Sequence, residues 1–417
     1  MLDTHLMSDH SAGIHPSTSS MLRPPRATPS VSSDTVQHQW VRWQNRTEDL
    51  VHAWQQLVDR SSPGKAYLSP RFVGPALQHL DQGRDPFIVM TREPFSAEPF
   101  SAEPAILMVA DACRFSTRAP FPHLRAFKSI HSFMTGFVVT PTCEVHDIES
   151  FFRSITSQGY LGIEMLYRIV ETPNWQDLLE GARRAGFDWV EYRRFSRAVI
   201  ETSQDIDMEA FMTSKRRKAF KSAMKGLASL GPVEHTVVTD PAELIAAGER
   251  FLDLEDKGWK HDRHVSLREN PAEEAFFREM FKSFSQAGQA RVCELRVGER
   301  VVASTIHLLS TDTSFAFKLG WDPELAKYKV GICQQVLTAQ NARRDFSDMA
   351  IIDSCTEGES FFEKLWPGRR QIASGIFVRR GMPSMMVRSL LNIKQLKRYL
   401  LPTDCAGDKH DGDPCGH

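Results

Sequence analysis

The sequence predicts an α/β (α+β) protein with two similar units in tandem, each a mixed, mostly antiparallel sheet flanked by helices. Three observations predict this class. Residues 205–401 carry helical patterns first, then three strand-like runs, and then alternating helices and strands. Residues 39–204 repeat this order more loosely. The length of 417 residues and the hydrophobic content of 41% suffice for two or three domains with sizeable cores.

The first unit is expected to begin with helices around LVHAWQQLVDR and PRFVGPALQHL. Strand-like runs follow at PFIVMTR, AILMVADA and FKSIHSFMTGFVVT. A helix at VHDIESFFRSI, a strand at LGIEMLYRIV, a helix at WQDLLEGARRAG and a strand at FDWVEYRRFSRAVIE complete the order. Residues 1–38 and 402–417 have the composition of chain that cannot bury enough surface to fold, so we expect two disordered tails.

The second unit is expected to begin with three helices. Residues 214–231 place apolar side chains at helical spacing and end at Gly231. The next two helices each start with a capping residue, a proline, and a glutamate three residues after the cap. The two capping residues are Asp240 and Asn270.

Strands dominate the rest of this unit. ARVCELRV and RVVASTIHLLS are joined by a two-residue turn at Gly298-Glu299, and TSFAFKLGW follows them. A helix at about 330–346, the apolar strand MAIIDSC, the helical GESFFEKLW and the alternating strand RQIASGIFVRR come next. A basic amphipathic helix at 383–400 closes the unit.

Composition excludes several classes of protein. The formal net charge is −1, so any attraction to nucleic acid or to an acidic membrane must come from a local patch. The seven cysteines include no CxxC pair, which argues against a disulfide framework and a zinc site and favours a reducing cytoplasm. No apolar run approaches the ~18 residues that span a bilayer, so no membrane insertion is expected.

Five stretches occur in an order that is typical of one enzyme superfamily: SKRRKAFKSAMKGLASLGPVE, LEDKGWK, GERVVASTIHL, FKLGWDPELAKYKVG and EGESFFEKLW. The chain resembles GNAT-superfamily acyltransferases, in particular the branch known as cellulose-biosynthesis-associated acetyltransferases. That branch is similar to the Fem-type aminoacyltransferases, which are tandem GNAT proteins. The resemblance covers about 205–380 well and 45–200 weakly. It assigns 39–204 to a degenerate GNAT-like domain and 205–401 to the acyltransferase domain.

The resemblance implies an N-acyltransferase. Such an enzyme moves an acyl group from a thioester donor, acetyl-CoA or another acyl-CoA, to a small-molecule amine by direct attack in a ternary complex, without a metal. Two alternatives stay open. One is aminoacyl transfer from aminoacyl-tRNA, as in the Fem-type enzymes. The other is a non-catalytic binding module that keeps the fold.

Gly331 is a single glycine between a predicted strand and a predicted helix, whereas many phosphate-binding loops carry two or three glycines. In a GNAT fold the backbone N–H groups at the start of this helix hold the pyrophosphate of coenzyme A, so one small residue suffices. A strand N–H near Ala316 to Leu319 would polarise the thioester carbonyl. The alternative is that Gly331 only permits tight packing. The resemblance implies that the acyl-CoA is bound by Lys318, Leu319, Lys327, Lys329, Val330, Gly331, Ile332 and Cys333.

Glu255 lies in the middle of the apolar stripe of its predicted helix, which is formed by Leu244, Gly248, Phe251 and Leu252. A carboxylate that faces inward can have a raised pKa and accept the proton of an attacking amine. The alternative is an inward glutamate paired with a lysine or an arginine. Trp259 and Lys260 follow directly and are candidates for the substrate pocket.

Asp353 ends a predicted strand next to the proposed donor strand, and it is the reserve candidate for the base. Glu357 and Glu359 follow it. Three carboxylates could bind a metal, but the two glutamates suit the start of the next helix better, so no metal is expected. Cys355 could act as a nucleophile, but the sequence shows no histidine neighbour that would activate it.

Residues 214–225 form a basic run without an acidic residue, and it includes Lys218 and Lys221. A solvated helix face explains such a run. A docking surface for coenzyme A phosphates, an acyl-carrier protein or tRNA is the functional alternative. The acceptor, the acyl chain and the oligomeric state have no signal in the sequence.

Overall fold

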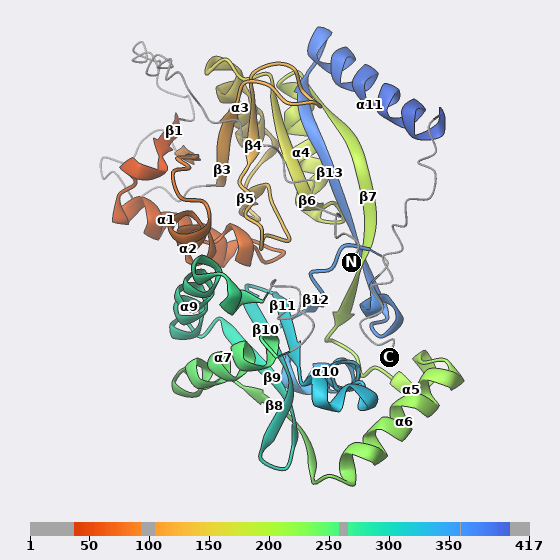
Figure 1. Ribbon diagram of the computed structural model, residues 1–417. Helices are drawn as coiled ribbons and strands as arrows, with labels where there is room; N and C mark the ends of the chain where they lie inside the picture. Colours follow the sequence, from red (N-terminus) through yellow and green to blue (C-terminus); the bar gives the residue numbers. More distant parts are fainter. Residues whose placement is uncertain (1–36, 93–104, 258–265, 359, 401–417) are drawn as a thin grey trace, which may run out of the picture. The chain divides into compact units, whose positions relative to one another are not determined.

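The computed structural model describes residues 37–92, 105–257, 266–358 and 360–400 (Figure 1). Trp259, Lys260 and Glu359, and most of the two predicted tails, lie outside these ranges. Within the described ranges no helix has both the length and the hydropathy needed to cross a bilayer.

The strands are β1 Gln37–Arg42, β2 Phe87–Arg92, β3 Ile106–Cys113, β4 His123–Ala126, β5 Phe137–Val139, β6 Gly162–Ile169, β7 Phe187–Glu201, β8 Val233–Val238, β9 Ala290–Val297, β10 Arg300–Ser310, β11 Thr313–Trp321, β12 Ile351–Asp353 and β13 Gly368–Arg379. The α-helices are α1 Glu48–Arg60, α2 Pro70–Pro75, α3 Val145–Ser157, α4 Pro173–Arg184, α5 Met208–Phe211, α6 Ser214–Ala228, α7 Pro241–Glu255, α9 Pro271–Gln286, α10 Val330–Asp345 and α11 Met382–Leu400. Short helical turns are η1 Trp43–Asn45, η2 Ala66–Leu68, η3 Ala76–Leu80, η4 Leu267–Glu269, η5 Pro323–Tyr328 and η6 Phe361–Lys364.

All these strands join one sheet, in the order β1-β2-β3-β4-β6-β13-β7-β12-β11-β10-β9-β8, with β5 beside β3. Only the pairs β4–β6 and β11–β12 are parallel among the described strands. The predicted fold class, a mixed and mostly antiparallel sheet with flanking helices, is confirmed.

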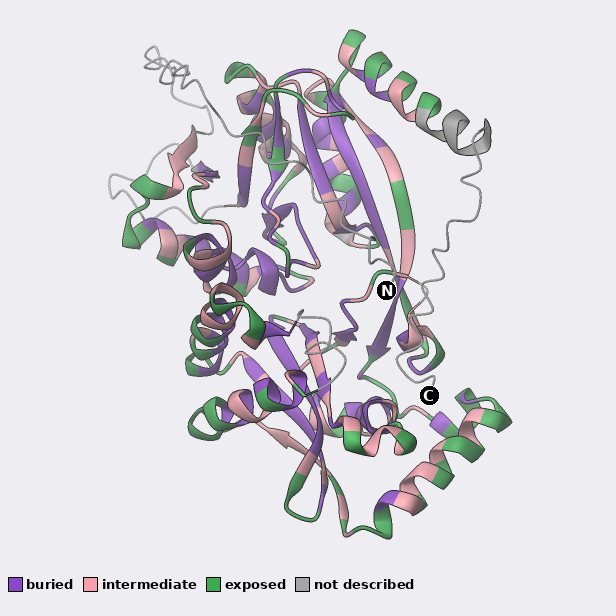
Figure 2. Ribbon diagram, viewed as in Figure 1, coloured by how far each residue is buried: buried purple, intermediate pink, exposed green. Residues whose placement is uncertain are grey.

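The helices begin where capping chemistry predicts. Asp240 accepts the N–H of Ala242 at the start of α7, and Asn270 accepts the N–H of Ala272 at the start of α9. Each cap satisfies a backbone donor that the first helical turn leaves without an acceptor. The largest core packs α1, α2, α7 and α9 on the sheet, and Figure 2 shows the buried residues concentrated along the strands.

One strand links the first half of the chain, the predicted unit 39–204, with the second half, the predicted unit 205–401. β13 follows the second unit in sequence, but it pairs with β6 on one side and with β7 on the other. The last residues of β7 pair in turn with β12, through Val199 and Asp353. The predicted division at residue 204 therefore falls directly after a strand that both halves use. The two tandem domains stay a prediction.

The first half contains an interruption that the sequence pattern does not show. FKSIHSFMTGFVVT, residues 127–140, was predicted as one strand, but only β5 lies within it. Residues 127–136 form no strand and follow β4, which pairs with β3 directly before them. Phe127 still donates its N–H to Val109. The excursion that follows brings His131 to the second half.

Candidate active site

The sheet opens between β11 and its parallel neighbour β12. These strands pair at only three positions, the last of which joins Phe315 to Asp353, where β12 ends. β11 continues to Trp321. Among the described strands, none pairs with the β12 side of β11 from Ala316 onward.

A β-bulge lies in this part of β11. Residues 306–307 of β10 are neighbours, but they face Lys318 and Ala316, so Phe317 is the extra residue. Phe317 packs in the core that contains α7 and α9, and Lys318 approaches Glu255 at the end of α7. The bulge thus turns two successive side chains toward the same helices.

The N-terminus of α10 follows β11 after one short turn. Lys329, the residue before the helix, has a left-handed backbone with φ of 51°. Cys333 donates its N–H to the carbonyl of Lys329 over 3.0 Å. The N–H groups of Val330, Gly331 and Ile332 have no carbonyl one turn earlier in the helix to accept them. The N–H of Cys333 is therefore already bonded within the helix, and in this it differs from the N–H groups of Val330, Gly331 and Ile332, which are also predicted to bind the pyrophosphate.

Gly331 lies against β11. A Cβ atom at this glycine would be 3.4 Å from Leu319 and 3.5 Å from Trp321, which are ordinary van der Waals distances, so packing alone does not require glycine here. Leu319 and Gly331, two residues predicted to bind the acyl donor, lie together. Lys327 and Lys329 are exposed beside the same turn, and Lys327 lies over the ring of Tyr328 at 4.9 Å.

The basic helix α6 packs against this turn. A Cβ atom at Gly226 would be 2.4 Å from the ring of Tyr328, so glycine is required for the approach. Lys218 and Lys221 are exposed on α6. Lys221 forms an ion pair of 2.7 Å with Glu209.

Glu255 is buried at the last position of α7. One carboxylate oxygen accepts the N–H of Leu267 over 2.8 Å, and the other lies 3.8 Å from the ammonium of Lys318. Gly320 allows the backbone contact, because a Cβ there would be 2.9 Å from the Glu255 nitrogen. The carboxylate thus faces the bulge of β11, where the sequence predicts an inward glutamate.

Two candidate functional residues, His131 and Glu273, could not be recognised as such from the sequence. His131, in the excursion of the first half, lies 2.8 Å from Glu273 at the start of α9. Glu273 is part of a capping pattern in the sequence, and that pattern alone explains it. His131 had no signal because its stretch has the alternation of an ordinary strand.

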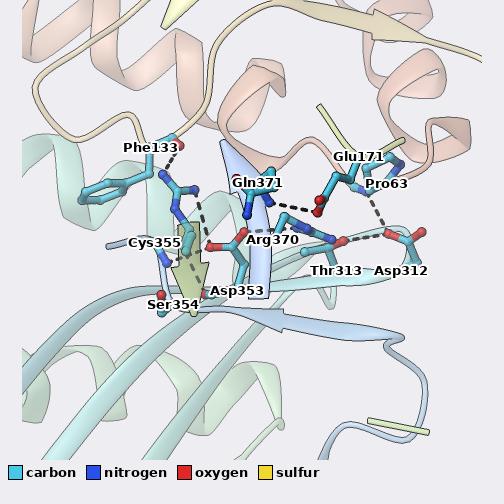
Figure 3. Close-up of polar contacts among 12 residues, drawn as sticks. Pro63, Phe133, Glu171, Asp312, Thr313, Asp353, Ser354, Cys355, Arg370 and Gln371 are labelled. Carbon is cyan, nitrogen blue, oxygen red and sulfur yellow. Dashed lines mark hydrogen bonds and ion pairs between the residues drawn. The ribbon is translucent and has the colours of Figure 1, made fainter. Parts of the chain in front are cut away.

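Asp353 lies at a buried junction of strands from both halves (Figure 3). Its carboxylate is 3.1 Å from Arg370 and 3.5 Å from Arg197, and it accepts the N–H of Cys355. Two guanidinium groups and a backbone donor thus occupy this carboxylate. Asp353 and Glu255 are not brought together, because Asp353 aligns with Phe315 and not with the bulge.

Cys355 is buried two residues after Asp353. Burial raises the pKa of its thiol, and the hydroxyl of Tyr67 donates to its sulfur over 3.2 Å. A thiol in this environment is a poor nucleophile. The described residues contain no group of three or more His, Cys, Asp or Glu side chains arranged to hold a metal ion.

The second half matches a known family. Residues 214–363 match the model of the acetyltransferase (GNAT) domain. The match includes α6, β11 and α10. No curated protein matches the chain.

The comparison with solved structures finds FemX similar to this chain over most of its length. FemX is 10% identical, with a TM-score of 0.51 over 82% of this chain and 98% of that chain. A tandem GNAT protein from the clavulanic acid biosynthesis pathway is 9% identical, with a TM-score of 0.38 over 83% of this chain and 99% of that chain. The likeness to FemX concerns the fold alone.

Proposed function

We propose that the second half binds an acyl-CoA and that the protein transfers the acyl group to an amine by direct attack in a ternary complex. One observation carries this proposal. β11 separates from β12 after Phe315, and the end of β11 lies against Gly331 at the N-terminus of α10.

Each part of this path suits one part of the donor. The N–H groups of Val330, Gly331 and Ile332 and the positive end of the α10 dipole would bind the pyrophosphate. Lys327 and Lys329 would add positive charge. A backbone N–H of β11 between Ala316 and Leu319 would polarise the thioester carbonyl. Lys318, beside the bulge, would line the acyl end of this path, and Leu319, against Gly331, would line its pyrophosphate end.

Contacts within the first half support placing the acyl-CoA site in the second half. Its equivalent parallel pair, β4 and β6, separates after two positions. Side chains bridge that opening: Thr135 exchanges two hydrogen bonds with the backbone of Leu166, and Arg168 donates to the carbonyl of Phe137. A donor would have to displace these contacts.

The attacking amine must lose a proton, and we propose that the proton leaves toward the side chains around Glu255. This is the side of β11 that faces α7 and α9, opposite α10. Asp353, the reserve candidate, is held by Arg197 and Arg370, and we propose a structural role for it. Trp259 and Lys260 stay sequence-based proposals for the substrate pocket.

A second candidate is a docking role for α6. Lys218 and Lys221 are exposed on a helix that packs against the turn before α10. This position suits the phosphates of coenzyme A, an acyl-carrier protein or tRNA. Charge reversal at Lys218 should then weaken binding of one of these partners in a salt-dependent manner.

Calorimetry with acetyl-CoA tests the proposal. Gly331→Glu and the double variant Lys327→Glu/Lys329→Glu should each lower the affinity at least tenfold, because both place negative charge beside the pyrophosphate. The double variant changes only exposed side chains, so it stays informative if Gly331→Glu is unstable. Unchanged affinity in the double variant, or no binding by the wild type, would contradict the donor assignment.

A further inference from the structure

Four titratable side chains from four segments meet on the α7 and α9 side of β11. His131 comes from the excursion between β4 and β5, Glu273 from the first turn of α9, Lys318 from β11 and Glu255 from the end of α7. His131 lies 2.8 Å from Glu273, and Lys318 lies 3.8 Å from Glu255. Asn270 also donates to the Glu273 carboxylate over 3.2 Å.

The imidazole of His131 is fixed beside the bulge. It stacks on Phe276 with 5.5 Å between ring centres, and it meets the edge of Phe317 at 6.1 Å. Phe317 is the extra residue of the bulge in β11. His131 is 7% exposed, so the ring is held by its neighbours while part of it reaches solvent.

The Glu273 carboxylate has neutral neighbours in this cluster. Burial lowers the pKa of His131, with Lys318 acting in the same direction and Glu273 and Glu255 opposing, so the imidazole is neutral at pH 7. Burial raises the pKa of Glu273, but the bond to His131 and the charge of Lys318 lower it on balance. The Glu273 carboxylate thus contacts a neutral imidazole and the neutral amide of Asn270. A partly buried carboxylate with these neutral contacts favours a cationic ligand.

We propose that Glu273 and His131 form the binding site for the protonated amine of the acyl acceptor, and that His131 takes the proton that frees this amine for attack. The inference rests on the proposed acyl transfer. The ammonium would bind to the Glu273 carboxylate, and Lys318 keeps Glu255 as its counter-ion.

The reaction balances in protons and bonds. The ammonium has three N–H bonds and the amide product has one. His131 takes the first proton, the amine nitrogen bonds to the thioester carbon, and the C–S bond breaks. The second proton goes to the departing thiolate, which leaves as a thiol, and His131 returns its proton to solvent.

This site explains why the second half is paired with a first half. His131 belongs to residues 127–136, which leave the sheet of the first half, whereas Glu273 and the bulge belong to the second. The amine site exists only where both halves meet, although the donor path lies in the second half.

The full chain offers a matched control. His79 in η3 and Glu279 in α9 form another histidine–glutamate pair between the same two halves, at 2.5 Å, but His79 and Glu279 are not at the bulge. The experiment compares His131→Gln and Glu273→Gln with His79→Gln and Glu279→Gln. Acetyl-CoA affinity is measured by calorimetry, and thiol release is followed from pH 5.5 to 9 with lysine, putrescine, glucosamine and a lysine-containing peptide as acceptors.

Donor affinity should stay unchanged in all four variants. Glu273→Gln should raise the amine KM at least tenfold. His131→Gln should lower kcat by ~10² and remove the fall in rate below the pKa of His131, because glutamine accepts no proton. The controls should match the wild type. An unchanged pH profile in His131→Gln, or equal losses in the controls, would overturn the assignment.

If no amine of this set is acetylated, a titration with n-butylammonium decides. The imidazole signals of His131 in histidine-labelled protein should shift saturably, those of His79 should not, and Glu273→Gln should weaken the response at least tenfold. No shift at His131 would overturn the amine site, while acetyl-CoA binding would still support the donor site.

Discussion

Glu255 shows how a side chain predicted from its spacing acquires its chemistry from its neighbours. The apolar stripe of α7 correctly predicts a buried carboxylate. The sequence could not show that Leu267 and Lys318 occupy the two oxygens, because both contacts depend on tertiary packing. A carboxylate that neutralises a lysine suits the role of counter-ion better than that of base.

Glu255→Gln therefore separates two roles. We expect kcat to fall about tenfold or more because Lys318 loses its counter-ion, while the acid limb of the pH–rate profile stays. Acetyl-CoA affinity should stay near that of the wild type. If the acid limb disappears in Glu255→Gln and persists in His131→Gln, Glu255 is the base and His131 is not.

Asp353 should affect stability more than turnover. Asp353→Asn leaves Arg197 and Arg370 buried without their carboxylate, and removal of one partner from a buried ion pair typically costs about 3 to 5 kcal/mol. Urea unfolding measures this loss. Glu191→Gln, which breaks the partly exposed pair with Arg194, is the control and should cost about 1 kcal/mol or less. Equal losses in both variants would contradict a structural role for Asp353.

At the scale of elements, capping signals and alternation predict well and long-range pairing does not. The starts of α7 and α9 follow from Asp240 and Asn270, because caps are local. RQIASGIFVRR was correctly predicted as a strand, but the place of β13 between β6 and β7 depends on partners 169 (Gly368 with Val199) to 216 (Val378 with Gly162) residues earlier in the chain. The β11 bulge and the left-handed Lys329 likewise have no local signature.

The shared strands predict that the halves do not fold separately. A fragment of residues 37–204 lacks β13 between β6 and β7, and a fragment of residues 205–400 lacks the end of β7 beside β12. Each should unfold without a cooperative transition, whereas co-expression should restore one. Cooperative unfolding of the 205–400 fragment alone would show that the predicted domain is independent.

Across the whole molecule, buried histidines set the response to acid. Burial lowers the pKa of His307 from 6.5 to about 3 and that of His235 to about 4. The unfolded chain therefore binds protons below pH 6.5 that the folded chain does not bind, and stability falls with pH from 6.5 toward 4.

Urea midpoints between pH 7.5 and 4 measure this dependence. The double variant His235→Asn/His307→Asn should show a shallower fall in midpoint with pH than the wild type, whatever its stability at pH 7.5. The matched exposed histidine, His146, should leave the slope unchanged when replaced by asparagine. An identical slope in the double variant would contradict the prediction.

The central claim is that an acyl-CoA lies along β11 with its pyrophosphate at the N-terminus of α10. The most direct test is the electron density of crystals grown with coenzyme A. We predict pyrophosphate density within hydrogen-bond distance of the N–H groups of Val330, Gly331 and Ile332, with the thiol beside the β11 bulge. Coenzyme A bound between β4 and β6 of the first half instead, or no density at α10 at a saturating concentration, would contradict the account.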